Sequence, residues 1–373
     1  MREMKDSGVK WVGEIPSSWK VYKVKQIADS NNDVLPENYE EEQEIDYIEI
    51  GSVTYEHGVR TTEKMKFGNA PSRARRIVHN GDTIISTVRT YLKAIAYIDD
   101  SLADKIVSTG FSVVTPHKDV VAKFLYYALS THSFISNVEA HSVGISYPAI
   151  NNTNLMDLKI VLPMQREQIQ IASYLDAKCS KIDEIIEKQQ AIIEKLKEYK
   201  FSIITEAVTK GINPDVELKD STIDMCEQIP VHWSISQNRY LFSLRDEKNY
   251  KSLEEVRLLS LYTDLGVFPH GEQEERGNKA VKAEGYKVVY ENDIVVNIIL
   301  AWMGAIGRSA YDGVTSPAYD IYKPNENVCS RYYHYLYRTK PFSAECYKYG
   351  RGIMAMRWRT YSSEFKSIKV PVP

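Results

Sequence analysis

The sequence predicts an α+β protein in which two similar α/β domains are joined by one long helix of the coiled-coil type. Two observations predict this architecture. A block near the N-terminus returns in the second half of the chain, and one apolar stripe runs between the two copies. With 373 residues, the chain has room for about two domains and a connector. The expected boundaries are residues 1–162 for the first domain, 163–210 for the helix and 211–373 for the second domain.

The repeat gives the chain a pseudo-two-fold organisation. Glu14–Pro16 followed by Trp19 returns as Gln228–Pro230 followed by Trp233, and we assign these tryptophans, like Trp11, to packing of the repeated entry segment. The later matches are strand-like stretches at 45–53 and 256–262, turns feeding apolar runs at 75–85 and 286–296, further strands at 108–116 and 315–324, helices at 123–129 and 331–337, and closing strands at 158–163 and 368–373. Duplication of a fold unit explains the repeat by itself. Because the polar loop residues differ between the copies, two binding modules of different specificity are also expected.

The segment from Pro163 to Lys210 has the period of a helix, with one apolar stripe and an opposite face of Lys, Asp and Glu. At ~1.5 Å per residue, such a helix is roughly 65–70 Å long. A long core or linker helix fits the pattern equally well, but a stripe of this length needs a partner along it. The residues expected to pair with another helix are Leu175, Ile182, Ile185, Ile192, Leu196, Tyr199 and Ile203.

Composition points to a soluble cytoplasmic protein. The sequence shows neither a signal peptide nor an apolar run of membrane-spanning length, so no membrane partner is expected. The four cysteines are scattered without a CxxC pair, which favours reduced thiols over disulfides or a zinc site. The net charge is only −3, so any nucleic-acid surface must come from local clustering of basic residues.

Catalytic signatures are missing from the sequence. There is no GxxxxGK[ST] phosphate loop, no Asn-Pro-Pro-aromatic or Asp-Pro-Pro-aromatic motif, and no HExxH spacing among the eight histidines. We therefore expect a protein that is not an enzyme by itself and holds neither metal nor cofactor. A stand-alone DNA-modifying enzyme remains the weakest alternative.

Basic and polar residues suited to DNA gather on expected loops. Arg, Asn and Ser can read base edges, while Lys and Arg more often contact phosphates. In the first half the candidates are Arg73, Arg75 and Arg76 before a turn, Arg89, Tyr91 and Lys93 after a strand-like run, and Ser146, Tyr147, Asn151 and Asn152 on a polar loop.

The second half offers candidates at matching places. Asn297, Trp302 and Met303 follow the equivalent strand, and a basic run without acidic residues comes later. The alternative for each candidate is a solvated surface residue, or a core residue for Trp302 and Met303. The members of the basic run are Arg351, Met354, Arg357 and Arg359, and Lys348 before the run could add a phosphate contact.

Several stretches together resemble the specificity subunit of type I restriction-modification enzymes. They are WVGEIPSSWKVYKVK, GDTIISTVRTYLKAIAY, STGFSVVTP, LPMQREQIQIASYLDAK and DIVVNIILAWMGAIGRSAYDGVTSPAYDIYKP. The resemblance implies two target-recognition domains that each read one half of a bipartite site on double-stranded DNA. It also implies that the helix docks methyltransferase subunits, which motor-nuclease subunits join. S-adenosylmethionine, ATP and Mg²⁺ would then belong to those partner subunits.

The sequence departs from the resemblance in one respect. Members of this family carry a second conserved helix after the second domain, and no such segment follows the strand that ends at Pro373. The unpaired stripe could therefore recruit a second copy of this chain. A scaffold or decoy that binds methyltransferase through its helix without directing specific methylation is the alternative function.

Overall fold

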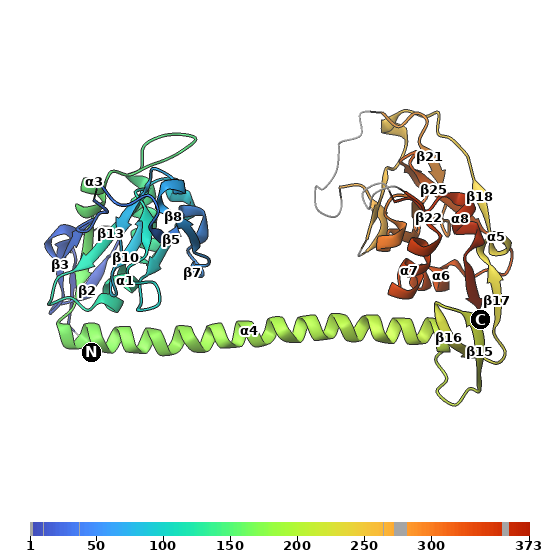
Figure 1. Cartoon of the computed structure of the whole chain (residues 1–373), viewed down its shortest axis with the longest axis horizontal. Helices are drawn as coiled ribbons and strands as arrows, with labels where there is room; N and C mark the ends of the chain where they lie inside the picture. Colours follow the sequence, from blue (N-terminus) through green and yellow to red (C-terminus); the bar gives the residue numbers. More distant parts are fainter. Residues whose placement is uncertain (1–2, 10, 37, 264, 272–281, 353–357) are drawn as a thin grey trace. The chain divides into compact units, whose positions relative to one another are not determined.

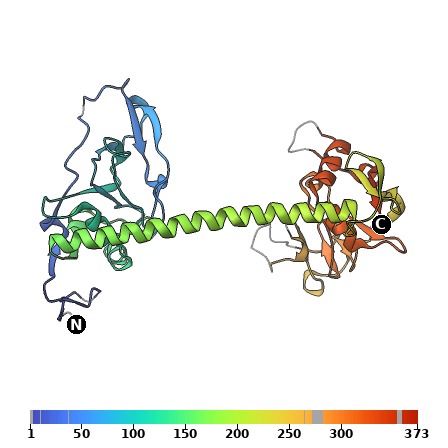
Figure 2. The same cartoon turned by 90° about the horizontal axis from the view of Figure 1, so that it is seen from below.

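The computed structural model describes residues 3–9, 11–36, 38–263, 265–271, 282–352 and 358–373. It divides into two compact units, Met1–Glu187 and Lys188–Pro373. The boundary between them falls inside helix α4 (Gln165–Lys210), which is continuous in both views (Figure 1 and Figure 2). The predicted α+β class is confirmed.

Unit 1 is built on a four-stranded antiparallel sheet in the order β11-β10-β13-β4. Helices α1 and α2 pack against this sheet, and their buried residues Leu125, Leu129 and Phe134 share a core with Ile85 and Ile95. A second sheet has the order β8-β5-β12-β9, and three strand pairs complete the unit. The bounds are β1 Met4–Asp6, β2 Glu14–Pro16, β3 Lys20–Lys23, β4 Ala28–Ser30, β5 Glu44–Ile48, β6 Val53–Thr54, β7 Gly58–Val59, β8 Glu63–Lys66, β9 Ala74–Ile77, β10 Thr83–Ser86, β11 Ile95–Tyr97, β12 Ile106–Ser108, β13 Phe111–Pro116, α1 Ala122–Leu129, α2 His132–Ala140, α3 Asn152–Met156 and β14 Lys159–Leu162.

Unit 2 repeats this topology. Its central sheet has the order β23-β22-β25-β18, which matches β11-β10-β13-β4 strand for strand, and β17 pairs with β26 as β3 pairs with β14. The internal repeat is thus confirmed as a repeat of structure. The bounds are β15 Leu218–Ile223, β16 Cys226–Pro230, β17 Ser234–Gln237, α5 Asn238–Leu241, β18 Phe242–Arg245, β19 Leu259–Tyr262, β20 Gly266–Pro269, β21 Lys287–Val289, β22 Ile294–Asn297, β23 Ile306–Arg308, β24 Gly313–Thr315, β25 Tyr319–Pro324, α6 Ser330–Leu336, α7 Lys340–Tyr349, α8 Ser362–Ser367 and β26 Lys369–Val372.

A buried aspartate closes the turn before the central strand in each unit. Gly81 and Asn292 take the left-handed backbone conformation, with φ of +95° and +75°, which glycine and asparagine adopt most readily. The next residue, Asp82 or Asp293, turns its carboxylate back onto a backbone N–H three residues earlier, at 2.8 Å and 2.9 Å. The matching sequences at 75–85 and 286–296 therefore encode the same turn.

Helix α4 is anchored in unit 1 by side chains of its first turns. It begins at Gln165, two residues after the expected start at Pro163. The Gln168 side chain accepts a hydrogen bond from the Val121 N–H at 2.8 Å, and the Trp19 indole donates to Glu167 at 3.1 Å. These contacts lock the start of the helix onto the entry segment of the repeat.

The last turns of α4 are anchored in unit 2. Val208 is buried in its core, and the Tyr332 hydroxyl donates to the Val208 carbonyl at 2.7 Å. Gly211, with φ of +80°, follows the last helical residue, as expected for a helix stop.

The apolar stripe of α4 is exposed over its middle turns. Of the residues expected to pair with another helix, Ile182, Ile185, Ile192, Leu196, Tyr199 and Ile203 are all exposed in the part of the chain that the structure describes. Leu175 differs, because it is half-buried and lines a pocket with Trp11 and Trp19 of its own unit. Leu175 therefore packs partly within unit 1, and its pairing with another helix stays a prediction.

His334 in α6 is held as a neutral imidazole. Its Nδ1 accepts the backbone N–H of Arg308 at 3.2 Å, a bond that an imidazolium cannot accept. Burial, together with the charges of Arg338 and Arg308, lowers the pKa of His334 to about 4.

Acid should therefore destabilise unit 2 through His334. Because the unfolded chain binds this proton more tightly, the stabilisation is complete above pH ~6.5 and is lost as the pH falls toward 4. We expect the free energy of unfolding in urea to fall between pH 7 and 4.5 by roughly 2 kcal/mol more in the wild type than in His334→Gln. Parallel pH profiles of the two proteins would contradict this assignment.

Candidate nucleic-acid interface

Two loops of unit 1 are joined into one rigid surface. The first follows β10 and covers residues 87–93, and the second is a hairpin over residues 143–149; together we name them loop surface A. Val143 and Ala149 exchange backbone hydrogen bonds of 2.8 Å and 3.0 Å across the base of the hairpin. The Ile150 N–H donates to the Thr87 carbonyl at 2.9 Å, so the hairpin is tied to the end of the central strand. Figure 1 shows this hairpin projecting from unit 1 near α3.

Loop surface A presents a cation stacked on an aromatic ring. Arg89 and Lys93 both have left-handed backbone, with φ of +52° and +53°, which is uncommon for such residues and typical of functional loops. The Arg89 guanidinium lies 5.2 Å from the centre of the Tyr147 ring. Tyr91 is exposed, while Lys93 lies 4.0 Å from Glu139. With the exposed Ser146, five of the predicted residues are therefore brought together.

Two predicted residues beside the hairpin have structural roles instead. The Asn151 side chain caps α3 by accepting the Asn154 N–H at 2.7 Å. Asn152 accepts from the Ser112 hydroxyl at 2.6 Å and donates to Ser30 at 2.8 Å. The expectation that the Asn152 amide faces DNA is corrected, because both of its ends are already bonded inside the unit.

The arginines at 73–76 come from the other sheet of unit 1. Arg73 is exposed, and its carbonyl accepts a hydrogen bond from the Thr109 N–H. The next residue, Gly110, accepts a hydrogen bond from the N–H of Thr87 in loop surface A. Arg75 lies over the Phe67 ring at 4.8 Å, and burial lowers the pKa of Arg76 below its usual value. Arg73 therefore borders loop surface A, whereas Arg75 and Arg76 are half-buried on β9.

Unit 2 carries the same pinned backbone pairing at the equivalent place. Arg351 and Arg359 exchange backbone hydrogen bonds of 2.9 Å and 3.0 Å, and the Thr360 N–H donates to the Ile298 carbonyl at 2.9 Å. The Arg351 guanidinium contacts Glu364 at 2.8 Å and lies 5.3 Å from the Tyr361 ring centre. We name the surface formed by Arg351, Arg359 and Tyr361 loop surface B.

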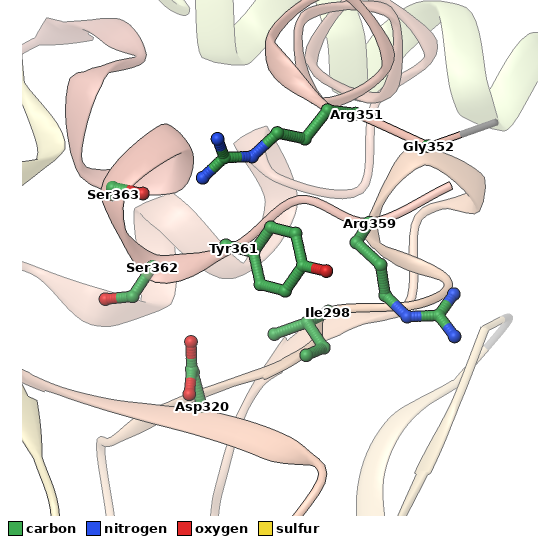
Figure 3. Close-up of a pocket in the computed structure, with 8 residues that line it drawn as sticks. All are labelled: Ile298, Asp320, Arg351, Gly352, Arg359, Tyr361, Ser362 and Ser363. Atoms are coloured by element: carbon green, nitrogen blue, oxygen red, sulfur yellow. The ribbon is translucent and has the colours of Figure 1, made fainter. Parts of the chain in front are cut away.

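Loop surface B surrounds an open pocket of about 1070 Å³. Figure 3 shows the Tyr361 ring between the Arg351 and Arg359 side chains, with Ile298 and Asp320 on the opposite wall. Tyr361, Ile298 and Asp320 were not expected from the sequence. Tyr361 could have been found from its position, because it follows the basic run and immediately precedes α8.

The remaining predictions in unit 2 have mixed outcomes. Asn297 is buried, with Oδ1 accepting the N–H groups of Ile299 and Leu300, so its expected DNA contact is corrected. Trp302 is half-buried and donates to the Ile299 carbonyl at 3.0 Å, which supports the core alternative, whereas Met303 is exposed. Lys348 is exposed and paired with Asp224. Met354 and Arg357 lie outside the described residues.

The segments that build both surfaces lack acidic residues, although Glu139 lies near Lys93 and Glu364 contacts Arg351 from just outside them. Residues 83–98 and 140–156 contain no Asp or Glu, and neither do residues 294–310 and 346–363. Within the described residues, no cluster of His, Cys, Asp and Glu could hold a metal ion, and no helix is long and apolar enough to cross a membrane. All four cysteines, each in the described part of the chain, are free thiols. Loop, charge and aromatic contacts together are the features with which proteins bind nucleic-acid backbones and bases.

A family model for the type I restriction modification DNA specificity domain matches residues 16–199. Over these residues, just under half of the chain, the sequence is similar to the specificity domain of type I restriction-modification systems. The matched residues include loop surface A and most of helix α4. In unit 2, the evidence of the same architecture is the repeated topology, since the central sheet, the closing strand and the backbone pair that follows α7 recur there.

Two curated relatives are named as type I specificity subunits. The MjaIX type I restriction enzyme specificity subunit of Methanocaldococcus jannaschii is 27% identical over 50% of this chain and 43% of its own length. A protein named for the MjaX specificity subunit of the same organism is 25% identical over 64% of this chain and 55% of its own. The chain thus spans about half the length of the curated relatives it matches.

Two solved structures share the fold at 19% identity. One is a chain from a study of complex assembly and conformational transition in a type I restriction-modification system, with a TM-score of 0.69 over 96% of this chain and 87% of that chain. The other is the HsdS subunit of Thermoanaerobacter tengcongensis, with a TM-score of 0.55 over 99% of this chain and 87% of that chain.

Proposed function

We propose that this chain is the non-catalytic DNA-recognition subunit of a type I restriction-modification complex, in which each unit reads one half of a bipartite site. The observation that carries the proposal is the repeated pinned backbone pairing. The same pair of reciprocal backbone hydrogen bonds joins Val143 to Ala149 in unit 1 and Arg351 to Arg359 in unit 2. One scaffold with two sets of side chains is what two readers of different sequence require.

The side chains of both units are suited to direct readout of bases, which supports the proposal that each unit reads one half-site. Arg89 and Arg351 each stack on a tyrosine, which restricts the guanidinium to a few orientations while leaving N–H donors available. A held guanidinium can bind guanine O6 and N7 or a phosphate. Exposed lysines near such a group add contacts to the phosphate backbone, which fix register without reading sequence.

The helix supplies the connection to the catalytic subunits in this proposal. A stiff helix would set the spacing between the two half-sites, and its exposed stripe would pack against methyltransferase subunits, which motor-nuclease subunits then join. S-adenosylmethionine, ATP and Mg²⁺ would act in those partners. A second copy of this chain could occupy the same stripe, because a long apolar face in water favours association.

The deciding experiment is a base-resolution methylome of cells that express this chain with its methyltransferase subunit. A split motif with a fixed gap would establish recognition by both units. A symmetric motif would indicate that two copies pair and that one type of unit reads. Complex formation without any motif would favour a scaffold, an alternative that the exposed stripe of α4 keeps open, and modification by the purified chain alone would indicate an enzyme.

A carboxylate in the stripe should separate the subunits. Ile192 is exposed on α4, and Ile192→Asp would place a charge in the apolar contact, which is strongly unfavourable once water is excluded. We expect methyltransferase affinity to fall by more than tenfold in a pull-down or by calorimetry. Gln190→Asp introduces the same charge elsewhere around the helix and should leave affinity nearly unchanged. Equal losses in both variants would show that the stripe is not the contact.

A further inference from the structure

The tip of the hairpin in unit 1 exposes apolar side chains to an unusual degree. Ile145 is 103% exposed, the highest value for a large apolar side chain among the described residues, and Val143 and Tyr147 are 79% and 67% exposed. Single exposed apolar residues are common, but a group of three on one projecting loop marks an interaction site.

This tip is held by its surroundings. Gly144 has φ of +114°, and a Cβ on it would lie 3.1 Å from the Tyr147 carbonyl oxygen, so the turn is too tight for a larger residue. Below the tip, the Val143–Ala149 backbone pair closes the hairpin, and Thr90 bonds to Ser142 at 2.8 Å. Ile145 is therefore presented in a fixed place and is not a side chain that has failed to find a core.

The charge beside the tip favours DNA as the partner. The residues that build loop surface A come from segments 83–98 and 140–156, which contain Arg89 and Lys93 but no acidic residue. The Arg89 guanidinium packs on Tyr147, two residues from Ile145, so a cation and an apolar group face the same partner. An apolar contact beside a cation suits the base edges of a groove, which has phosphates on both sides.

We propose that the 143–149 hairpin enters the major groove and that Ile145 contacts the 5-methyl group of a thymine, so that the half-site read by unit 1 contains an A·T pair at that position. This inference rests on the proposed function. A two-stranded hairpin fits the ~12 Å major groove, whereas the ~6 Å minor groove would have to open around it. The thymine methyl is the apolar group that the major groove offers, and apolar side chains recognise it.

The test uses uracil in place of thymine, which removes only the 5-methyl group. The full chain in complex with its methyltransferase is titrated with duplexes carrying the methylome-defined motif, in which each thymine of the motif is replaced in turn. For the wild type, uracil at one position of one half-site should weaken binding about fourfold for the single methyl group no longer buried. For Ile145→Ala, binding to the thymine duplex should weaken by a similar factor, and uracil at that position should have no further effect.

Controls keep folding and function separate from the inference. Met4→Ala, which shortens an exposed apolar side chain of the same unit on β1, should leave both duplexes unchanged. Because Ile145 makes no core contact, Ile145→Ala should melt at the wild-type temperature. If the loss of affinity from Ile145→Ala adds to the loss from uracil at every position tested, the inference is wrong while the proposed function stands. The same holds if the affected half-site contains no thymine. Binding that ignores uracil but falls with Ile145→Ala would indicate a minor-groove contact and would also overturn it. Absence of any sequence-specific methylation would instead remove the proposed function itself.

Discussion

Replacing Asp293 with alanine is expected to destabilise unit 2 by about 3 kcal/mol, since removing one partner of a buried ion pair leaves the other charge poorly compensated. Asp293 is 1% exposed and receives two bonds from Arg245, at 2.9 Å and 3.2 Å, together with the Tyr290 N–H. Packing of Arg245 over Tyr290 partly offsets the loss. The measurement is the free energy of unfolding in urea, with hydrogen exchange assigning the transition to unit 2.

The matched control is Asp82→Ala in unit 1. Asp82 closes the same turn but is bonded by the Thr115 hydroxyl and the His79 N–H, both neutral groups. Its removal should therefore cost only about 1–2 kcal/mol. A loss for Asp82→Ala that equals or exceeds the loss for Asp293→Ala would show that the Arg245 pair is not what stabilises the turn of unit 2.

Replacing Arg351 with alanine should remove recognition of one half-site. This side chain is 68% exposed, and it is oriented by Glu364 and by the Tyr361 ring, which leaves further N–H donors for a base. Because a bidentate contact to guanine is worth ~1–3 kcal/mol, we expect affinity for the specific duplex to fall roughly tenfold to a hundredfold. In the methylome, specificity should relax in the half-site of unit 2 and stay intact in that of unit 1.

Arg351→Lys separates base reading from phosphate binding. Lysine keeps the charge but loses the planar fork, so it should behave like alanine if Arg351 reads a base and like the wild type if it contacts only phosphate. Lys348→Ala, at an exposed neighbour paired with Asp224, should weaken binding to all sequences about equally. An unchanged methylation motif in Arg351→Ala would contradict the assignment.

Much of the fold could be predicted from the sequence because it depends on local patterns. The turn at Gly81–Asp82 and its copy at Asn292–Asp293 are short, contiguous and chemically constrained, so their match reveals the repeat. The stripe on α4 follows from the helical period alone. The start and the end of that helix lie within two residues of the expected positions, because Pro163 and Gly211 limit the helix through their own backbone conformations.

The candidate interface was less predictable because side-chain availability depends on residues far away in the sequence. Asn152 and Asn297 have the chemistry of base readers, but the first is bonded by Ser30 and Ser112, and the second by the backbone of its own turn. Conversely, Ile145 has the chemistry of a core residue, and a pinned hairpin holds it in solvent.

By itself, the sequence determined the class of the fold, the duplication and the helix between the copies, since these arise from the spacing of apolar residues and from turns with one feasible backbone. Only the tertiary structure decided which polar groups are free to meet DNA. The pairing of Ile150 with Thr87 and of Thr360 with Ile298 joins loops that lie about sixty residues apart in each unit and so creates the two surfaces. Those long-range backbone bonds form as the core packs, and no local pattern encodes them.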